Sequence, residues 1–314
     1  MSEHAFDISI VGELNPDLIF YGVPRELPEE REMLSTGFSL TLGSSSAILA
    51  HNLSLLGTKV TFAAYVGRDV FGELCCQTLR EAGADVSHVE YAPSGINTGV
   101  TVILPLENTR RILTYPGAMF ELSMEHLDMD HLASARHFHM SSLFLHRRLS
   151  PDIPRLFEEM RQRGLTTSLD TNDDPDGKWN GVLGEVLKLV DILFCTEREL
   201  LNISGKSELA AAERDLSGRI PTLVVKRGSR GASAFIGERR IDAEALRVTL
   251  KDQVGAGDSF DAGFLHQWLQ SAPIETCLAY GNVAGALCVT RSGGTEAFKD
   301  AAHRTEFIAA HFRQ

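Results

Sequence analysis

Strand-forming runs alternate with amphipathic helical stretches along most of this 314-residue chain, and that alternation restricts the folds available to it. Runs rich in β-branched and other apolar residues predict strands at 6–11, 60–66, 137–145, 165–170, 190–195 and 222–226. Helical spacing of apolar residues predicts helices at 45–56, 72–82, 152–163, 181–189, 207–217 and 258–270. We therefore expect an α/β fold, a three-layer sandwich in which helices cover both faces of a mainly parallel sheet.

Two segments, 12–42 and about 94–118, break this alternation, because their residues alternate in polarity with no long helix between them. They predict a small separate β-sheet inserted into the main domain. In an open α/β fold, an insert beside the strand ends would form a lid over a ligand crevice. Because the chain shows no internal repeat and no Pro- or Ser-rich linker, we expect residues 1–314 to form a single domain with this lid.

Composition excludes several classes of function. The formal net charge of −12 disfavours a broad nucleic-acid-binding face, since Lys and Arg supply most of the affinity for phosphate backbones. No uninterrupted apolar run reaches the ~18 residues of a membrane span, and the N-terminus lacks the features of a secretory signal. Five scattered cysteines without a C-x-x-C pair suggest reduced thiols. We expect a soluble, cytoplasmic protein that binds neither nucleic acid nor a membrane.

The segment DQVGAGDSFDAGFL, at 252–265, places two glycines and an alanine directly before an aspartate and a predicted helix. Small residues let the backbone approach a ligand, and successive N–H groups at a helix start bind an anion. Phosphoryl transfer needs this arrangement, with Gly255, Ala256 and Gly257 as the anion hole. Asp258 at the mouth of the turn can accept the proton of an attacking hydroxyl. A plain helix start with Asp258 as its N-cap is the alternative interpretation.

Three other patterns do not amount to a site. Phe260 stands where a dinucleotide-binding fingerprint needs its third glycine. The GKS run at 205–207 follows Leu200 instead of the glycine that a phosphate-binding P-loop requires. His137 and His139 alternate along a predicted strand without a partner at metal-ligand spacing, so we interpret them as strand residues.

Together with blocks nearer the N-terminus, the glycine segment resembles the PfkB/ribokinase family of carbohydrate and nucleoside kinases, in order along nearly the whole chain. DQVGAGDSFDAGF is similar to the family's D-T-x-G-A-G-D-x-F-x-A-G. The resemblance implies a ribokinase-like fold and transfer of the ATP γ-phosphoryl, with Mg²⁺, onto a sugar-like hydroxyl. It also implies that Asp258 is the general base.

The N-terminal blocks imply the substrate-binding residues. GELNPD resembles the family's G-x-x-N-x-D, whose aspartate binds substrate hydroxyls, and this implies roles for Asn15 and Asp17. A carboxylate suits that role because it can accept two hydroxyl hydrogen bonds at once. GSSSAILAHNLSLLG resembles the glycine-rich segment that lines the sugar pocket, which adds Gly43 and Ser44.

The C-terminal half carries the nucleotide-binding blocks of the same family. TERE resembles N-E-x-E, KRGSRGA resembles T-x-G-x-x-G-A, and YGNVAGALCVTRSGG resembles the adenine-side helix with its following loop. These matches imply nucleotide contacts from Thr196, Lys226, Gly228, Gly231 and Asn282. They imply that Glu199 holds Mg²⁺ through water. Many members hold a monovalent cation such as K⁺, and the ligands implied here are Asp252 with carbonyls of Val254, Cys288, Arg291 and Gly293.

Departures from the family pattern bear on the substrate. Ser44 replaces a second glycine, Ile48 replaces an asparagine that often contacts the substrate, and Ala297 replaces a serine of the cation site. Asp174 stands where sugar-acid kinases have an arginine, and a negative group there would repel an acidic substrate. The resemblance therefore implies a neutral sugar, a hexose or pentose, and a homodimer formed through the lid sheets.

Three alternatives remain open. The chain could phosphorylate a nucleoside or a sugar acid, since Arg110 and Arg111 in the lid segment could reach an acid or a phosphate. It could be a non-catalytic sugar- or nucleotide-binding regulatory relative, which the altered Ile48 and Thr196 would suit. A dehydrogenase that binds a nucleotide cofactor is supported only by the glycines.

Overall fold

The structure, a computed structural model, describes residues 4–106 and 109–312, and these residues form a main sheet of nine strands. In spatial order the strands are β13 (Arg239–Ala243), β12 (Ala232–Ile236), β11 (Thr222–Lys226), β10 (Ile192–Thr196), β9 (Thr166–Asp170), β8 (Ala135–Ser141), β1 (Phe6–Val11), β4 (Val60–Val66) and β5 (Val89–Tyr91). Every pairing from β11 to β5 is parallel, whereas β12 pairs antiparallel with both of its neighbours.

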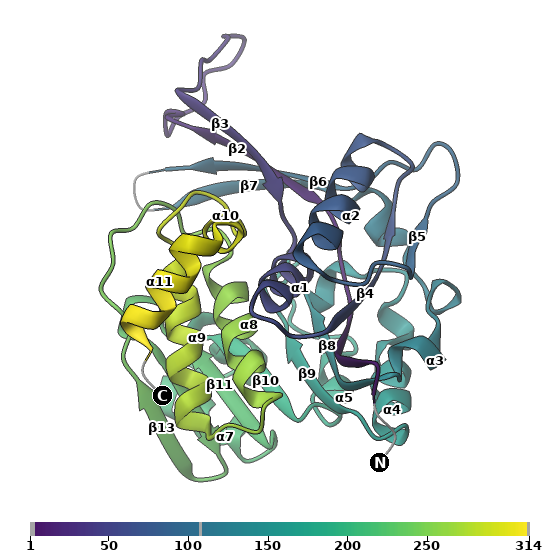
Figure 1. Cartoon of the computed structure of the whole chain (residues 1–314), viewed down its shortest axis with the longest axis vertical. Helices are drawn as coiled ribbons and strands as arrows, with labels where there is room; N and C mark the ends of the chain where they lie inside the picture. Colours follow the sequence, from purple (N-terminus) through teal and green to yellow (C-terminus); the bar gives the residue numbers. More distant parts are fainter. Residues whose placement is uncertain (1–3, 107–108, 313–314) are drawn as a thin grey trace.

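Helices cover both faces of this sheet (Figure 1). One face packs against α1 (Ser45–Leu55), α2 (Val70–Ala82), α8 (Ala256–Trp268) and α9 (Ile274–Cys288). The other face packs against α3 (Met129–Leu132), α4 (Ile153–Gln162), α5 (Leu183–Val186), α6 (Glu197–Ser204) and α7 (Leu209–Ser217). Two further helices, α10 (Glu296–Lys299) and α11 (Ala301–His311), pack beside α9.

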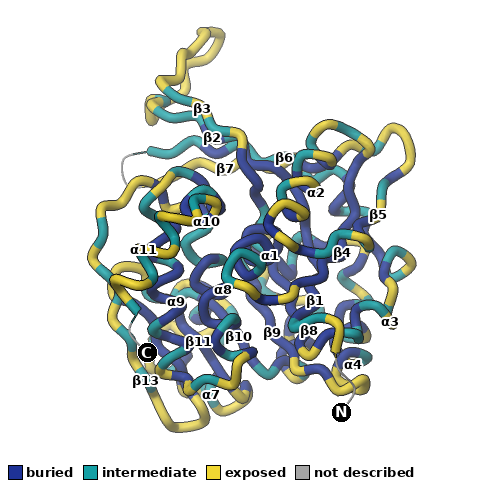
Figure 2. The backbone as a smooth tube through the Cα atoms, in the orientation of Figure 1, coloured by how far each residue is buried: buried dark blue, intermediate teal, exposed yellow. Residues whose placement is uncertain are grey.

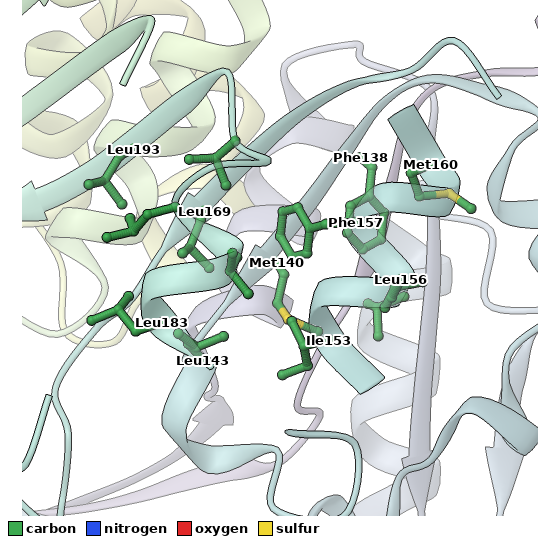
Figure 3. Close-up of a cluster of buried hydrophobic side chains, with 14 of the residues drawn as sticks. Phe138, Met140, Leu143, Ile153, Leu156, Phe157, Met160, Leu169, Leu183 and Leu193 are labelled. Atoms are coloured by element: carbon green, nitrogen blue, oxygen red, sulfur yellow. The ribbon is translucent and has the colours of Figure 1, made fainter. Parts of the chain in front are cut away.

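The apolar cores explain why the central strands read as near-continuous hydrophobic runs. All seven residues of β4 are buried, because a parallel sheet with helices on both sides leaves neither face to water. Figure 2 shows these strands buried beneath more exposed helix surfaces. On the α4 side, Phe138 and Met140 of β8 interdigitate with Phe157 and Met160 of α4 (Figure 3). The predicted three-layer α/β sandwich is confirmed.

A second sheet, formed by four strands of the described residues, lies beyond the carboxyl ends of the main strands (Figure 1). Its order is β3 (Gly37–Leu42), β2 (Pro16–Tyr21), β6 (Val100–Pro105) and β7 (Arg110–Tyr115). These four strands fall within the two segments that broke the sequence pattern. Residues 107–108 of the second segment lie outside the described residues. One face of the sheet rests on the main domain, where Ile19 and Ile103 pack against Val254.

Some elements differ from the sequence-based predictions. The strand predicted over 137–145 ends at Ser141, because Ser142 takes a left-handed conformation with φ 55° and a 3₁₀ turn follows. The helix predicted over 181–189 shortens to the four residues of α5. The β12–β13 hairpin was not predicted; its edge strand β13 carries exposed charges at Arg239 and Arg240 that mask the strand pattern.

Two buried histidines form a hydrogen-bonded ladder along β8 and β9. His137 lies 2.7 Å from the hydroxyl of Thr166 and 2.6 Å from that of Ser168. His139 lies 2.7 Å from Ser168 and 2.8 Å from Ser141. Burial lowers the pKa of His137 to about 3 and that of His139 to about 4, so both imidazoles are neutral at physiological pH. The interpretation of both as strand residues agrees with this packing.

These depressed pKa values predict a loss of stability in mild acid. Between pH 6.5 and the folded-state pKa, the unfolded chain binds protons that the folded chain does not. The free energy of unfolding should therefore fall by roughly 2 kcal/mol per histidine between pH 7 and pH 5. Urea unfolding at the two pH values measures this, and a His137→Gln/His139→Gln double variant should lose most of the difference. The exposed His4→Gln variant is the control, and equal pH dependence in all three proteins would contradict the prediction.

Candidate active site

The glycine turn lies at the start of α8, where the backbone must pass close to another segment. Gly255 has φ 72°, a left-handed conformation that favours glycine. A Cβ atom at Gly255 would lie 2.5 Å from the Cα of Gly294, so no side chain fits there. The first N–H groups of a helix have no acceptor within the helix. The Ala256 N–H donates to the Gln253 carbonyl at a long 3.4 Å, and those of Gly257 and Asp258 are available to an anion.

Asp258 lies in the first turn of α8 and is half-buried, so its carboxylate is not sealed in the interior. Burial raises the pKa of Asp258 to about 6, Lys226 opposes this increase, and Asp170 adds to it. A carboxylate with this pKa is ionised at neutral pH and still has a useful proton affinity. Such a group is suited to accept a proton from a hydroxyl.

Asp17 is the second residue of β2, in the small sheet, and is 5% exposed. Burial raises its pKa to about 7, and the strongest charge acting on it is Asp258, which raises it further. A Cβ atom at Gly43 would lie only 2.1 Å from Oδ1 of Asp17, so the carboxylate occupies space that only glycine leaves open. The structure therefore places the predicted substrate-binding aspartate and the predicted base in one electrostatically coupled group.

The chain that follows Gly43 is held by backbone contacts. The carbonyl of Asn15 accepts the Gly43 N–H at 3.0 Å, and the Ser44 hydroxyl accepts the Asn15 N–H at 2.9 Å. Ser44 has φ 68°, a conformation that disfavours side chains, as expected where the family has glycine. Ile48 packs under the glycine turn, because a Cβ atom at Gly294 would lie 2.6 Å from its Cδ1. The change from asparagine thus replaces a polar contact with apolar support for the turn.

A buried polar network beside this segment was not singled out from the sequence. Glu13 is 3% exposed, and its carboxylate accepts the Ser46 hydroxyl at 2.8 Å and the Ser142 hydroxyl at 2.9 Å. Burial alone would raise the pKa of Glu13, but His146 at 3.5 Å and Ser46 lower it overall. Asn172 accepts the Ser142 N–H at 2.9 Å and so joins the network. Glu13 stands within GELNPD and Asn172 within LDTNDDP, which were the available clues.

Asp174 has a different role from the one its position implied. Its carboxylate accepts the N–H groups of Lys178 and Trp179, each at 2.7 Å, and that of Asp176 at 3.0 Å. The side chain therefore holds its own loop together instead of facing a ligand. The Asp174 charge is thus spent on its own loop, whereas the carboxylates around Asp17 bear on the charge of a substrate.

On the nucleotide side, Thr196 and Glu199 form a reciprocal cap at the start of α6. The Thr196 N–H donates to Glu199 at 2.7 Å, and the Thr196 hydroxyl accepts the Glu199 N–H at 3.3 Å. Glu199 is 7% exposed, and its pKa is raised by burial and by Asp170. Within the described ranges, no group of three or more His, Cys, Asp or Glu side chains could hold a metal ion directly. Glu199 therefore fits a Mg²⁺ contact through water, since Mg²⁺ usually keeps several waters.

The predicted nucleotide loop lies between β11 and β12. Gly228 has φ 58° with open space around it, whereas a Cβ atom at Gly231 would lie 2.0 Å from the carbonyl oxygen of Ala243. Asn282 donates its amide hydrogens to the carbonyls of Ala243 at 3.0 Å and Glu244 at 3.1 Å. Asn282 thus positions the segment that Gly231 contacts. A contact between Asn282 and the adenine base stays a prediction, and such a contact would have to use the amide oxygen of Asn282.

Lys226, at the end of β11, does not face open space as a phosphate donor would. Its ammonium lies 2.5 Å from Asp170 Oδ2 and 2.9 Å from Asp261 Oδ2. Asp261 lies one turn after Asp258 on the same helix. The sequence comparison pointed to the lysine but not to its two carboxylate partners.

The predicted cation ligands are close together and are largely used within the protein. Asp252 accepts the N–H groups of Val254 and Gly293, both at 3.0 Å, and the Tyr21 hydroxyl at 3.2 Å. The Cys288 thiol lies 3.3 Å from the Val254 carbonyl. Arg291 points its guanidinium at Asp300, at 2.6 Å, which leaves only its carbonyl for a cation. K⁺ binding stays a prediction.

The comparison with protein families decides the identity of this fold and site. Residues 5–301 match the family described as "pfkB family carbohydrate kinase". The chain belongs to that family. The predicted assignment to an ATP-dependent carbohydrate kinase is confirmed at this level, and we refer to the protein as the kinase from here on.

Individual relatives of the kinase differ in the acceptor their names state. An ATP-dependent ribose-1-phosphate kinase of Halopiger xanaduensis is 29% identical over 81% of the kinase and 82% of the relative. A ribokinase of Arabidopsis thaliana is 28% identical over 95% and 79% of the two chains. The crystal structure of adenosine kinase from Sinorhizobium meliloti superposes with a TM-score of 0.86 at 20% identity, covering 96% of the kinase and 99% of that chain. Family membership therefore leaves the acceptor open.

The contact between Gly43 and Asp17 predicts the effect of one added methyl group. In a Gly43→Ala variant, the new Cβ would displace the Asp17 carboxylate, with a cost of about 1–3 kcal/mol for overpacking. Chemical unfolding measures the lost stability, and the acceptor KM should rise because the carboxylate moves. Gly184→Ala in α5 is the matched control, since a Cβ there would meet nothing within 4 Å. A Gly43→Ala kinase with wild-type stability and KM would refute this packing argument.

Proposed function

We propose that the kinase transfers the ATP γ-phosphoryl group to a hydroxyl of a neutral sugar, a hexose or pentose, with Asp258 as general base. The observation that carries the proposal is the position of a half-buried carboxylate in the first turn of a helix that begins at a glycine turn. Its pKa of about 6 leaves it ionised at neutral pH. The same carboxylate acts directly on Asp17, the predicted ligand of substrate hydroxyls.

The proposed step needs only groups already described. The acceptor hydroxyl gives its proton to Asp258 as its oxygen forms a bond to the γ-phosphorus. The bond from that phosphorus to the bridging oxygen breaks, and ADP leaves with the electron pair. The backbone N–H groups of Gly255, Ala256 and Gly257 neutralise charge on the moving group. Mg²⁺, held through water by Glu199, would supply further charge neutralisation at the phosphates.

The charges around the acceptor side favour a neutral sugar. Asp17, Glu13 and Asp258 all bring carboxylates to this region, and carboxylates accept hydroxyl hydrogens while repelling acidic groups. The positive charge acting on Asp17 comes from Arg110 of the small sheet. Arg110 is therefore the residue through which a sugar acid or a sugar phosphate would be accepted instead, whereas Arg111 donates to the carbonyl of Arg25.

We also propose that the small sheet is a lid on a single domain. The Tyr21 hydroxyl on β2 donates to Asp252. Ile19 and Ile103 pack on Val254, which lies two residues before the start of α8. Movement of this sheet would therefore expose or cover the turn directly.

All five cysteines are buried free thiols, which supports the predicted cytoplasmic location. Among the described residues, no helix is both long and apolar enough to cross a membrane.

The outer face of the lid supports a homodimer. Its residues form an apolar row across all four strands, paired in the order Leu40, Leu18, Val102 and Leu113. Leu113 is 72% exposed and Phe38 is 55% exposed. Contiguous apolar surface of this kind on a sheet usually marks an interaction site. A second copy of the same face would cover it by a two-fold interface.

An assay of ADP release across neutral sugars, sugar acids, sugar phosphates and nucleosides tests the reaction. We expect a neutral sugar to give the highest kcat/KM, and Asp258→Asn to lower kcat by about 10²–10⁴-fold. Asp130→Asn, which changes a 90% exposed carboxylate, is the control. Full turnover by Asp258→Asn would eliminate the proposed base. Binding of ATP and sugar by calorimetry without ADP from any acceptor would instead favour the non-catalytic alternative.

Sedimentation of the purified kinase tests the dimer. The wild-type kinase should sediment as a dimer and a Leu40→Glu/Leu113→Glu variant as a monomer. Burial of the two glutamate charges in an apolar interface would cost more free energy than the interface supplies. Ile236→Glu changes an exposed apolar residue in the β12–β13 hairpin, away from the lid (Figure 1), and should remain dimeric. A single-chain wild-type kinase would rule out the interface.

A further inference from the structure

A buried cluster of one ammonium and two carboxylates lies directly beneath the glycine turn. The Lys226 ammonium lies 2.5 Å from Asp170 and 2.9 Å from Asp261. The lysine side chain is 11% exposed and each carboxylate only 1%. Removal of three charged groups from water is costly, so such a cluster must be held by its own mutual contacts.

The three residues come from three elements that meet at the carboxyl edge of the main sheet. Asp170 ends β9, Lys226 ends β11, and Asp261 lies on α8. The ammonium therefore links the start of α8 to two strand ends that flank β10 in the sheet. Asp258 lies three residues before Asp261 in α8, so the two residues share one face of the helix.

The ammonium also approaches the turn backbone closely. A Cβ atom at Gly257 would lie 3.4 Å from Nζ of Lys226, an ordinary contact distance, so the ammonium packs directly against the turn. Two of the three ammonium donors face the carboxylates, and their negative charge offsets that of the ammonium. Lys226 thus offers little net positive field to a phosphate, although it lies close to where one would bind.

Burial and mutual contacts shift the pKa values within the cluster. Burial raises the pKa of Asp261 well above its usual value, Lys226 opposes this, and Asp170 adds to it. Oδ1 of Asp261 has no hydrogen-bond partner among the described residues. The pKa of Lys226 is raised well above its usual value by Asp170 and Asp261, against the effect of burial. Lys226 is therefore held as a cation, and it opposes the effect of burial on both carboxylates: the pKa of Asp170 is lowered, whereas that of Asp261 stays raised.

We propose that Lys226 is a positioning residue of the transfer site, which fixes the glycine turn and Asp258 to the sheet by bridging Asp170 and Asp261, and not a ligand of the transferred phosphate. The inference rests on the proposed function of Asp258 as base. Without the ammonium, the two carboxylates would face each other across β9 and α8. Repulsion between the two carboxylates, or uptake of a proton by one of them, would then shift the start of α8.

The same cluster sets the electrostatic surroundings of Asp258. The groups that act on Asp258 are Lys226 from β11, Asp170 from β9, the Ser45 hydroxyl from α1 and Glu13 after β1. From the lid, Asp17 on β2 faces it, with Arg110 on β7 acting on Asp17 in turn. Lys226 is the positive member of this set that acts on the base directly. Its removal should make Asp258 harder to ionise.

The test measures kcat, the KM for ATP, the affinity for ATP by calorimetry, and the pH dependence of kcat/KM for the acceptor. For Lys226→Met, a positioning role predicts that kcat falls at least about tenfold while the KM and Kd for ATP change less than about threefold. The acid limb of kcat/KM should move up by about one pH unit, as Asp258 loses its cationic neighbour. Lys206→Met, at an exposed turn, is the matched control and should match the wild type.

A charge-free variant, Asp170→Asn/Lys226→Met/Asp261→Asn, separates repulsion from direct phosphate contact. A positioning role predicts that it recovers at least part of the kcat lost in Lys226→Met, since no buried carboxylates are left to repel. If Lys226→Met does not fold, this variant is compared with the wild type, and an unchanged Kd for ATP supports the proposal. A rise of about tenfold or more in KM and Kd for ATP, with an unmoved acid limb, would overturn it.

The calorimetric readout keeps this test separate from that of the proposed function. If the wild-type kinase releases no ADP with any acceptor, the assignment of Asp258 as base fails. The affinity for ATP still decides the role of Lys226, because a phosphate ligand would weaken it on substitution and a positioning residue would not.

Discussion

The site depends on how closely the backbone at the start of α8 approaches its neighbours. A Cβ atom added at Gly255 would lie 2.5 Å from the Cα of Gly294, and one added at Gly43 would lie 2.1 Å from the Asp17 carboxylate. Asp252 then fixes the turn through the N–H groups of Val254 and Gly293. Because side chains are excluded at these points, N–H groups and carboxylates can converge on one small space.

That convergence requires several carboxylates to share a poorly solvated region. The structure accommodates them in different ways. Glu13 is kept ionised by hydroxyls and His146, Asp170 by Lys226, while burial raises the pKa values of Asp17 and Asp258 to about 7 and about 6. Groups with pKa values spread in this manner can take distinct roles in binding and proton transfer.

The small sheet and the segment around Asp252 and Glu296 are parts of the same arrangement. Tyr21 on β2 donates to Asp252, and Thr41 on β3 donates to Glu296 at 3.1 Å. Strands of the small sheet are thus bonded to both segments that support the glycine turn. These hydrogen bonds give the small sheet a physical route by which its position would affect the turn.

The sequence by itself determined the α/β class, six of the seven parallel strands and the glycine turn with Asp258, because these depend on local periodicity and on short motifs. Tertiary structure alone decided what the side chains contact. Asp174 turned onto its own loop, Asn282 onto the carbonyls of Ala243 and Glu244, and Lys226 onto Asp170 and Asp261. The partners of Asn282 and Lys226 lie on other elements, and those of Asp174 depend on how its own loop closes. A buried charge or amide must be paired with a polar partner, and which partner is in reach depends on the fold, not on a pattern along the chain.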